Sequence, residues 1–333
     1  MKKIFWLLLL WPFHQALSQD SLAILSSIPQ QDTLITNFLP DSTFAQKPSS
    51  GLNKKRVYTV AAIDAAVLVG TGISLYNTWY SSYPQSDFHF FNDNGEWLQV
   101  DKFGHSYTCY TLSRLSAESW RWAGLSQRQS TWIGAASGMA YQTIVEVMDG
   151  FSANWGFSWG DYVANTAGAA LFVGQQLVWG EQRISYKFSF HKIDYGSQEL
   201  NDRADDIFGS TTRERMLKDY NSQTYWLSAN LKSFFKHSNL PKWLNVAVGY
   251  GANNMFGAYY NSWTDPSNGH VINHEQDMPR YRQFYIAPDV DFTKIKTKSK
   301  LLKTTFSILN CLKFPAPSIE FSQGKVKWNW LTF

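Results

Sequence analysis

The chain has 333 residues, of which 44 % are hydrophobic, 17 % aromatic and 17 % charged, and its formal net charge is +4. This composition excludes an intrinsically disordered chain, which would be rich in charge and poor in aromatic residues. The charge is uneven: residues 57–180 hold nine acidic and four basic side chains, whereas residues 181–333 hold 20 basic and 14 acidic ones. No nucleic-acid motif accompanies the basic end, which therefore indicates an anionic lipid surface or an acidic partner rather than DNA.

The N-terminus has the order of a secretory signal. Lys2 and Lys3 precede the apolar run IFWLLLLWPF, and ALSQD follows it. We predict a signal peptide over residues 1–18, cleaved after Ser18, because the run is too short to span a bilayer. The protein is then exported to the periplasm or a membrane, the outer membrane included. No cysteine lies near the cleavage site, so a lipid would have no acceptor there.

Residues 19–50 are rich in Ser, Gln, Thr and Pro and predict a flexible tether. A helical bundle is predicted over residues 51–182, with helices at 57–80, 102–123, 130–150 and 161–180. Small residues four apart, as in Gly134-xxx-Gly138 and Ala164-xxx-Gly168, let helix backbones approach closely. This spacing suits both a bundle partly in the membrane and a tightly packed periplasmic bundle, and the sequence leaves the two open.

A β-containing region is predicted over residues 183–333, which makes the fold class α+β. Period-two alternation predicts strands in ISYKFSF, LNVAVGY, RYRQFYIAPDVDF and KVKWNWLTF, and residues 297–313 predict an amphipathic helix beside several lysines. The two cysteines, Cys109 and Cys311, are about 200 residues apart, and we expect two buried thiols rather than a disulfide.

Polar residues in the helical segments occur in pairs at helical spacing. The pairs are Asp101 with His105, Glu146 with Asp149, and Asp161 with Asn165. Residues three or four apart share a helix face, so each pair presents polar groups from an apolar background. Each pair taken alone can be a helix cap or a solvated edge. Taken together, the three pairs support one shared polar site as strongly as they support separate caps and edges, because an isolated buried carboxylate is costly.

These motifs carry a resemblance to known families. DKFGHSYTCY, TIVEVMDGF and GFSWGDYVANTAG together resemble the YfiM-like family of predicted periplasmic lipoproteins of unknown function. More loosely, the chain is similar to VanZ-like membrane proteins linked to glycopeptide resistance. The shared pattern is an Asp-Lys-x-x-His opening, an acidic residue on a later helix and a closing Asp-x-x-x-Asn-x-x-Gly element. The resemblance covers about residues 95–180 and implies a cell-envelope address rather than a reaction.

Two functions remain open from the sequence. In the first, a membrane-associated envelope protein binds an envelope component through Asp101, Lys102, Asp161 and Asn165. In the second, the protein is a metal- or histidine-dependent hydrolase or transferase in which His105, Glu146 and Asp149 are catalytic. Gly156-Phe157-Ser158-Trp159-Gly160 matches G-x-S-x-G in letters, but no strand precedes it as a nucleophile elbow requires. Neither a cofactor, a particular metal nor an oligomeric state follows from the residues.

Overall fold

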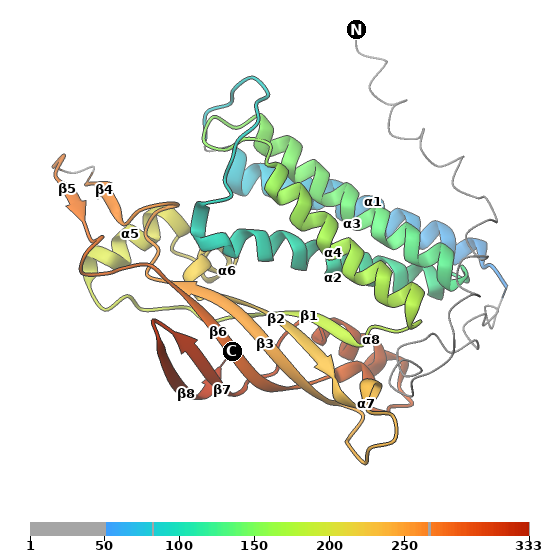
Figure 1. Cartoon of the computed structure of the whole chain (residues 1–333). Coiled ribbons are helices and arrows are strands. Elements are labelled where there is room, and N and C mark those ends of the chain that lie inside the picture. Colours follow the sequence, from blue (N-terminus) through green and yellow to red (C-terminus); the bar gives the residue numbers. More distant parts are fainter. Residues whose placement is uncertain (1–50, 82, 266–267, 333) are drawn as a thin grey trace, which may run out of the picture. The chain divides into compact units, whose positions relative to one another are not determined.

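A computed structural model describes residues 51–81, 83–265 and 268–332 of the chain. The predicted signal peptide and tether, over residues 1–50, lie outside the described residues. All described residues belong to one unit, residues 40–333. Four long helices form a helical region on one side of a six-stranded antiparallel sheet (Figure 1). The predicted α+β class is confirmed.

Four long helices and several short ones follow along the described chain. The α-helices are α1 (Lys54–Leu75), α2 (Val100–Trp122), α3 (Gln127–Gly150), α4 (Trp159–Val178), α5 (Gln198–Phe208), α6 (Thr212–Lys218), α7 (Leu231–Phe234) and α8 (Lys300–Leu309). A π-helical turn, Tyr76–Tyr80, continues α1, and a 3-10 turn, Glu96–Gln99, precedes α2. Each of the four predicted helical segments overlaps one of the first four helices.

The main sheet has the strand order β1-β2-β3-β6-β7-β8 with every neighbouring pair antiparallel. Its strands are β1 (Ile184–Phe190), β2 (Gln223–Asn230), β3 (Leu244–Asn253), β6 (Tyr281–Val290), β7 (Ala316–Ser322) and β8 (Lys325–Thr332). A separate hairpin pairs β4 (Ser262–Thr264) with β5 (Val271–Asn273). The four strand segments named from sequence are confirmed as β1, β3, β6 and β8, and β2, β4, β5 and β7 are additional.

The main core lies between α2 and the sheet. Val100 and Tyr110 of α2 join Tyr186 of β1, Tyr225 of β2 and Tyr250 of β3 in one buried cluster. The register pairs Tyr225 with Tyr250 across β2 and β3, so their side chains lie on the same face of the sheet. This part of the apolar sheet face is therefore buried against the helical region, whereas Val248 and Phe284 on the same face are about half exposed.

The opposite face of the sheet is buried as well, although it is more polar. Lys187 Nζ lies 2.8 Å from Asp289 Oδ2, and both side chains are fully buried. Trp226 is also fully buried on this face, beside Gly249, where a Cβ atom would come within 2.6 Å of the indole. The small residues of β3 thus make room for a large side chain from β2.

Helix α1 stands apart from the other helices in its exposure. Of its 22 residues only Val60 is buried, while Ile63, Val69 and Ile73 are more than half exposed. Among the described residues it is also the one helix that is long and apolar enough to cross a membrane, by length and composition. Cys109 and Cys311 are both buried and free, as expected.

Candidate functional site

Glycines bring α2, α3 and α4 close together. A Cβ atom on Gly134 would come within 2.4 Å of the Ser113 carbonyl oxygen, and one on Gly138 within 2.4 Å of the Ser113 hydroxyl. A Cβ on Gly168 of α4 would lie 2.0 Å from the carbonyl oxygen of Ser106 on α2. These contacts leave no room for a side chain, so polar groups next to them on the three helices face one another at short range.

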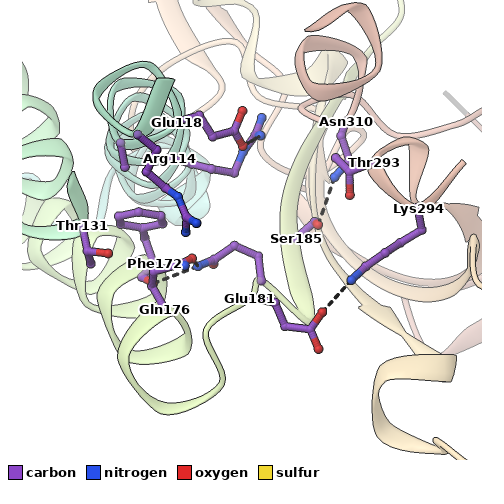
Figure 2. A pocket seen from close by; sticks show the side chains of 13 residues that line it. Arg114, Glu118, Thr131, Phe172, Gln176, Glu181, Ser185, Thr293, Lys294 and Asn310 are labelled. Atoms are coloured by element: carbon purple, nitrogen blue, oxygen red, sulfur yellow. Dashed lines mark hydrogen bonds and ion pairs between the residues drawn. The ribbon is translucent and has the colours of Figure 1, made fainter. Parts of the chain in front are cut away.

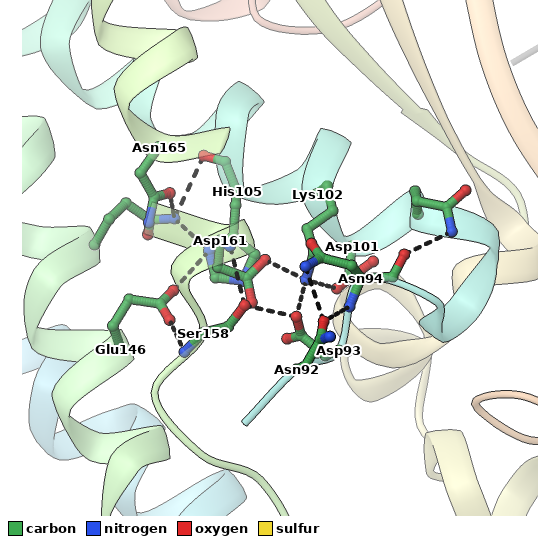
Figure 3. Close-up of polar contacts among 12 residues, drawn as sticks. Asn92, Asp93, Asn94, Asp101, Lys102, His105, Glu146, Ser158, Asp161 and Asn165 are labelled. Carbon is green, nitrogen blue, oxygen red and sulfur yellow. Dashed lines mark hydrogen bonds and ion pairs between the residues drawn. The ribbon is translucent and has the colours of Figure 1, made fainter. Parts of the chain in front are cut away.

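Lys102 forms the centre of the first group of charges. Its Nζ lies 2.6 Å from Asp93 Oδ1, 2.9 Å from Asp101 Oδ2 and 2.8 Å from Asp161 Oδ1 (Figure 3). Asp93 lies in the loop before α2, and Asp161 lies in the first turn of α4. One ammonium therefore joins carboxylates from three segments of the chain.

His105 forms the centre of the second group, one turn further along α2. Its Nδ1 lies 3.2 Å from Glu146 Oε1 on α3, and its Nε2 lies 3.6 Å from Asp161 Oδ1 on α4. The predicted convergence of His105, Glu146 and Asp161 is thus present in the structure. The amide of Gln142 lies 3.1 Å from His105 Nδ1 and donates a 2.8 Å hydrogen bond to Asn165 Oδ1, which connects Asn165 to the same group.

Asp149 contributes to the same region without contacting His105. Its Oδ1 accepts a 2.7 Å hydrogen bond from the Tyr80 hydroxyl. Asp149 and His105 both line a cavity of about 150 Å³ that opens between the ends of the helices. The described lining includes five acidic side chains and neither lysine nor arginine: Asp93, Glu96, Asp101, Asp149 and Asp161. The cavity is therefore rich in carboxyl groups, three of which also contact the Lys102 ammonium.

Burial shifts the ionisation of these groups. Desolvation raises the pKa of Glu146 to about 8, and the nearby charge of Asp149 adds to the shift. Desolvation likewise raises the pKa of Asp149 to about 7, and it raises the pKa of Asp161, which also hydrogen-bonds with Asp93. The same cause lowers the pKa of His105 to about 4, so its imidazole is neutral at pH 7.

The segment that leads into α2 has an unusual backbone. Trp97, Leu98 and Gln99 have φ values of 46°, 48° and 66°, in the left-handed region that non-glycine residues seldom adopt. The Trp97 N–H donates to the Ala258 carbonyl at 2.8 Å, and the Gln99 side chain accepts from Arg282 at 2.7 Å. Contacts from the sheet region therefore hold the loop that carries Asp93 against the start of α2.

The cap interpretation of the aspartates is not what the structure shows. Gln99 occupies the N-cap position of α2 and Ser158 that of α4, so Asp101 and Asp161 lie inside the first turns instead. Ser158 accepts from the Asp161 N–H at 3.1 Å and donates to Asp93 at 2.6 Å. It is a buried cap, and in the described part of the chain no strand leads into it as a nucleophile elbow would require.

Sequence reasoning missed three members of this arrangement, namely Asp93, Gln142 and Tyr80. Gln142 lies four residues before Glu146 on α3 and shares its face, so helical spacing could have found it. Asp93 lies in the turn-like stretch FNDNG, where an aspartate usually serves the turn itself. No local pattern points to its contact with Lys102.

A second cavity, of about 280 Å³, lies between α2 and α4 on one side and β1 and the segment before α8 on the other (Figure 2). Two ion pairs account for four of its charged side chains. Lys294 Nζ lies 2.6 Å from Glu181 Oε2, and Arg114 Nη1 lies 2.6 Å from Glu118 Oε1. These charges neutralise one another, so this cavity is a weaker candidate for a site than the acidic one.

Comparison with known proteins gives one family match. Residues 87–175 match the model of a family described as predicted periplasmic lipoprotein (DUF2279). The match covers about a quarter of the chain and contains every predicted site residue. Neither the comparison with curated proteins nor that with solved structures found a match. The family description confirms the predicted localisation, an exported protein of the periplasm or a membrane, and agrees with the resemblance to periplasmic lipoproteins of unknown function.

Proposed function

We propose that this protein is a membrane-associated cell-envelope protein that binds an envelope component in its acidic cavity. The observation that carries the proposal is the convergence of Lys102, His105 and four carboxylates from a loop and three helices. Caps and solvated helix edges would not bring these groups to one place. The similarity to YfiM-like and VanZ-like proteins belongs to the same proposal, since it rests on these motifs.

The chemistry of the cavity indicates the kind of ligand. Its acidic lining attracts groups that donate hydrogen bonds, such as hydroxyls and amines, and repels phosphates. Trp97, Trp155 and Tyr220 also line the cavity and offer flat apolar surfaces. Carboxylates beside aromatic rings suit a hydroxyl- or amine-bearing group of the envelope.

Two exposed apolar helices support association with a membrane. The outward face of α1 carries Ile63, Val69 and Ile73, each more than half exposed. In α8, Leu301 is 75 % exposed and Ile308 is 56 % exposed, beside several lysines. An apolar face flanked by lysines favours the boundary of an anionic membrane.

The strained loop is consistent with a binding role. Residues held in left-handed backbone conformations cost on the order of 1–3 kcal/mol each and tend to occur at functional sites. Here three consecutive residues, Trp97 to Gln99, connect the loop of Asp93 to the helix of Asp101. The chain thus accepts strain at the place that aligns the two carboxylates on Lys102.

Binding can be tested with the detergent-purified full chain and soluble peptidoglycan fragments, which bear hydroxyls and amines. Titration calorimetry should show saturable binding, and Glu146→Ala should abolish it. Glu118→Ala is the matched control, because Glu118 lies on α2 with its side chain 46 % exposed and away from the cavity. Inorganic phosphate should bind much more weakly than the fragments. Absence of saturable binding, or equal binding by the two variants, would contradict the proposal.

A second candidate function is hydrolysis or group transfer. It is favoured by the position of His105, a neutral imidazole between Glu146 and Asp161 that could accept a proton. Mass spectrometry of the same fragments after incubation with the protein would detect cleavage. Binding without any cleaved product would eliminate this candidate and leave the binding function in place.

A further inference from the structure

The two groups of carboxylates differ in how their charge is neutralised. Asp93, Asp101 and Asp161 could hold a cation between them, but the ammonium of Lys102 already lies within 2.9 Å of an oxygen from each. His105, Glu146 and Asp161 also place one ligand atom each within 4.8 Å of one another. This second triangle consists of two carboxylates and one imidazole.

Glu146 is the least compensated member of the second triangle. Its side chain is completely buried, and its Oε1 accepts no hydrogen bond from the described residues. The other oxygen, Oε2, accepts from the Ser158 N–H at 3.3 Å, which leaves Oε1 directed toward His105 (Figure 3). A buried carboxylate oxygen without a donor is costly unless a proton or a cation compensates it.

From this geometry we infer that His105, Glu146 and Asp161 bind one divalent transition-metal ion of the Zn²⁺ type. The inference deepens the proposed function, since it concerns the same cavity. One imidazole nitrogen and two carboxylate oxygens are ligands that Zn²⁺ accepts, whereas Mg²⁺ and Ca²⁺ prefer oxygen alone. Three protein ligands would leave a coordination position open toward the cavity.

The surroundings of the triangle fit such an ion. Gln142 contacts His105 Nδ1 at 3.1 Å, which restrains the ring orientation, as second contacts of metal-binding histidines commonly do. Asp161 Oδ1 lies 2.8 Å from Lys102 Nζ and 3.6 Å from His105 Nε2, so this oxygen faces the ammonium and the triangle together. The cavity beside His105 and Asp161 provides a path of entry. The ion would also supply a positive charge in direct contact with Glu146, which has none among the described residues.

Metal binding can be measured without any assay of activity. The full chain is purified in detergent, treated with a chelator and titrated with Zn²⁺ alone. We expect one ion per chain, and a Kd at least about tenfold higher in Glu146→Gln, because removal of even a supporting contact costs metal affinity of that order. Glu118→Gln should bind as the wild type does. Zn²⁺ should bind more tightly than Mg²⁺ or Ca²⁺.

Cobalt provides a second readout that does not depend on the stability of a variant. Co²⁺ bound to the wild-type chain should show visible absorption typical of four or five ligands, and Zn²⁺ should displace it. Failure of the wild type to retain stoichiometric Zn²⁺, or unchanged affinity in a folded Glu146→Gln, would overturn the inference. If Glu146→Ala still abolishes fragment binding in that case, the proposed function survives and only the metal site fails.

Discussion

The close approach of α4 to α2 can be tested with two glycines on the same helix. Gly168 lies against α2, where a Cβ atom would come within 2.0 Å of the Ser106 carbonyl oxygen. Gly174, six residues later on the same helix, would have nothing within 4 Å of its Cβ. Alanine in a helix is favoured over glycine by about 1 kcal/mol, and this gain applies at both positions.

Gly174→Ala should therefore raise the free energy of unfolding by up to about 1 kcal/mol. In Gly168→Ala the backbones must separate, and overpacking of this kind costs about 1–3 kcal/mol or more. Because a carbonyl oxygen cannot rotate away as a side chain can, we expect the cost to exceed the helix gain. Because the helix gain is common to both, the two variants should differ by the overpacking cost, about 1–3 kcal/mol or more, with opposite signs.

Chemical unfolding of the detergent-purified protein, followed by tryptophan fluorescence, measures both values. Gly168→Ala should also weaken ligand binding, because separation of α4 from α2 moves Asp161 away from His105. Equal stability of the two variants would refute the close-packing argument, and a destabilised Gly168→Ala with unchanged binding would refute the link to the site.

Three further predictions concern the sheet and the basic helix. Lys187→Met should lower the unfolding free energy by about 3–5 kcal/mol, because it leaves Asp289 buried without its nearest cation. The control Lys300→Gln, on the exposed surface, should change the unfolding free energy by less than about 0.5 kcal/mol. Equal effects of the two substitutions would contradict a stabilising buried pair. Burial lowers the pKa of Lys313 to about 8, below its value in the unfolded chain, so the unfolded state binds more protons between about pH 8 and pH 10. The unfolding free energy of the wild type relative to Lys313→Met should therefore rise over this range. A difference that does not change with pH would show that Lys313 is not desolvated. A third variant replaces five lysines with glutamine: Lys294, Lys296, Lys298, Lys300 and Lys303. It should bind anionic liposomes markedly more weakly at low salt, by about 1 kcal/mol for each lysine near the membrane surface. Unchanged liposome binding would indicate that these lysines only form a solvated edge.

Local periodicity predicted most of the secondary structure. The four long helices could be found as long segments with few charges and with small residues at helical spacing, and strands such as β1 and β3 because their apolar residues alternate. Strand β2 was missed because consecutive residues on both of its faces are buried and its apolar residues do not alternate. Strand β7 was missed because its second residue, Pro317, weakens the strand pattern. Only the packing revealed that Trp226 fills the space beside Gly249.

The sequence by itself determined which residues could form a polar site. Asp101, His105, Glu146 and Asp161 were recognisable because charges are rare in these helices and occur at helical spacing. That pattern could not distinguish a site from helix caps, since both place an aspartate near a helix start. Ser158 and Gln99 occupy the cap positions, which frees both aspartates for Lys102 and His105.

Only the tertiary structure decided how the charges are divided. Spacing along one helix sets directions around its axis, but it does not set the distance between helices. The glycine contacts of α3 and α4 with α2 set that distance, and the loop of Asp93 closes over Lys102 because the sheet region holds it there. As a result one ammonium neutralises three aspartates, while Glu146 stays buried beside a neutral histidine. This difference arises from contacts between residues distant in the chain, which no local pattern encodes.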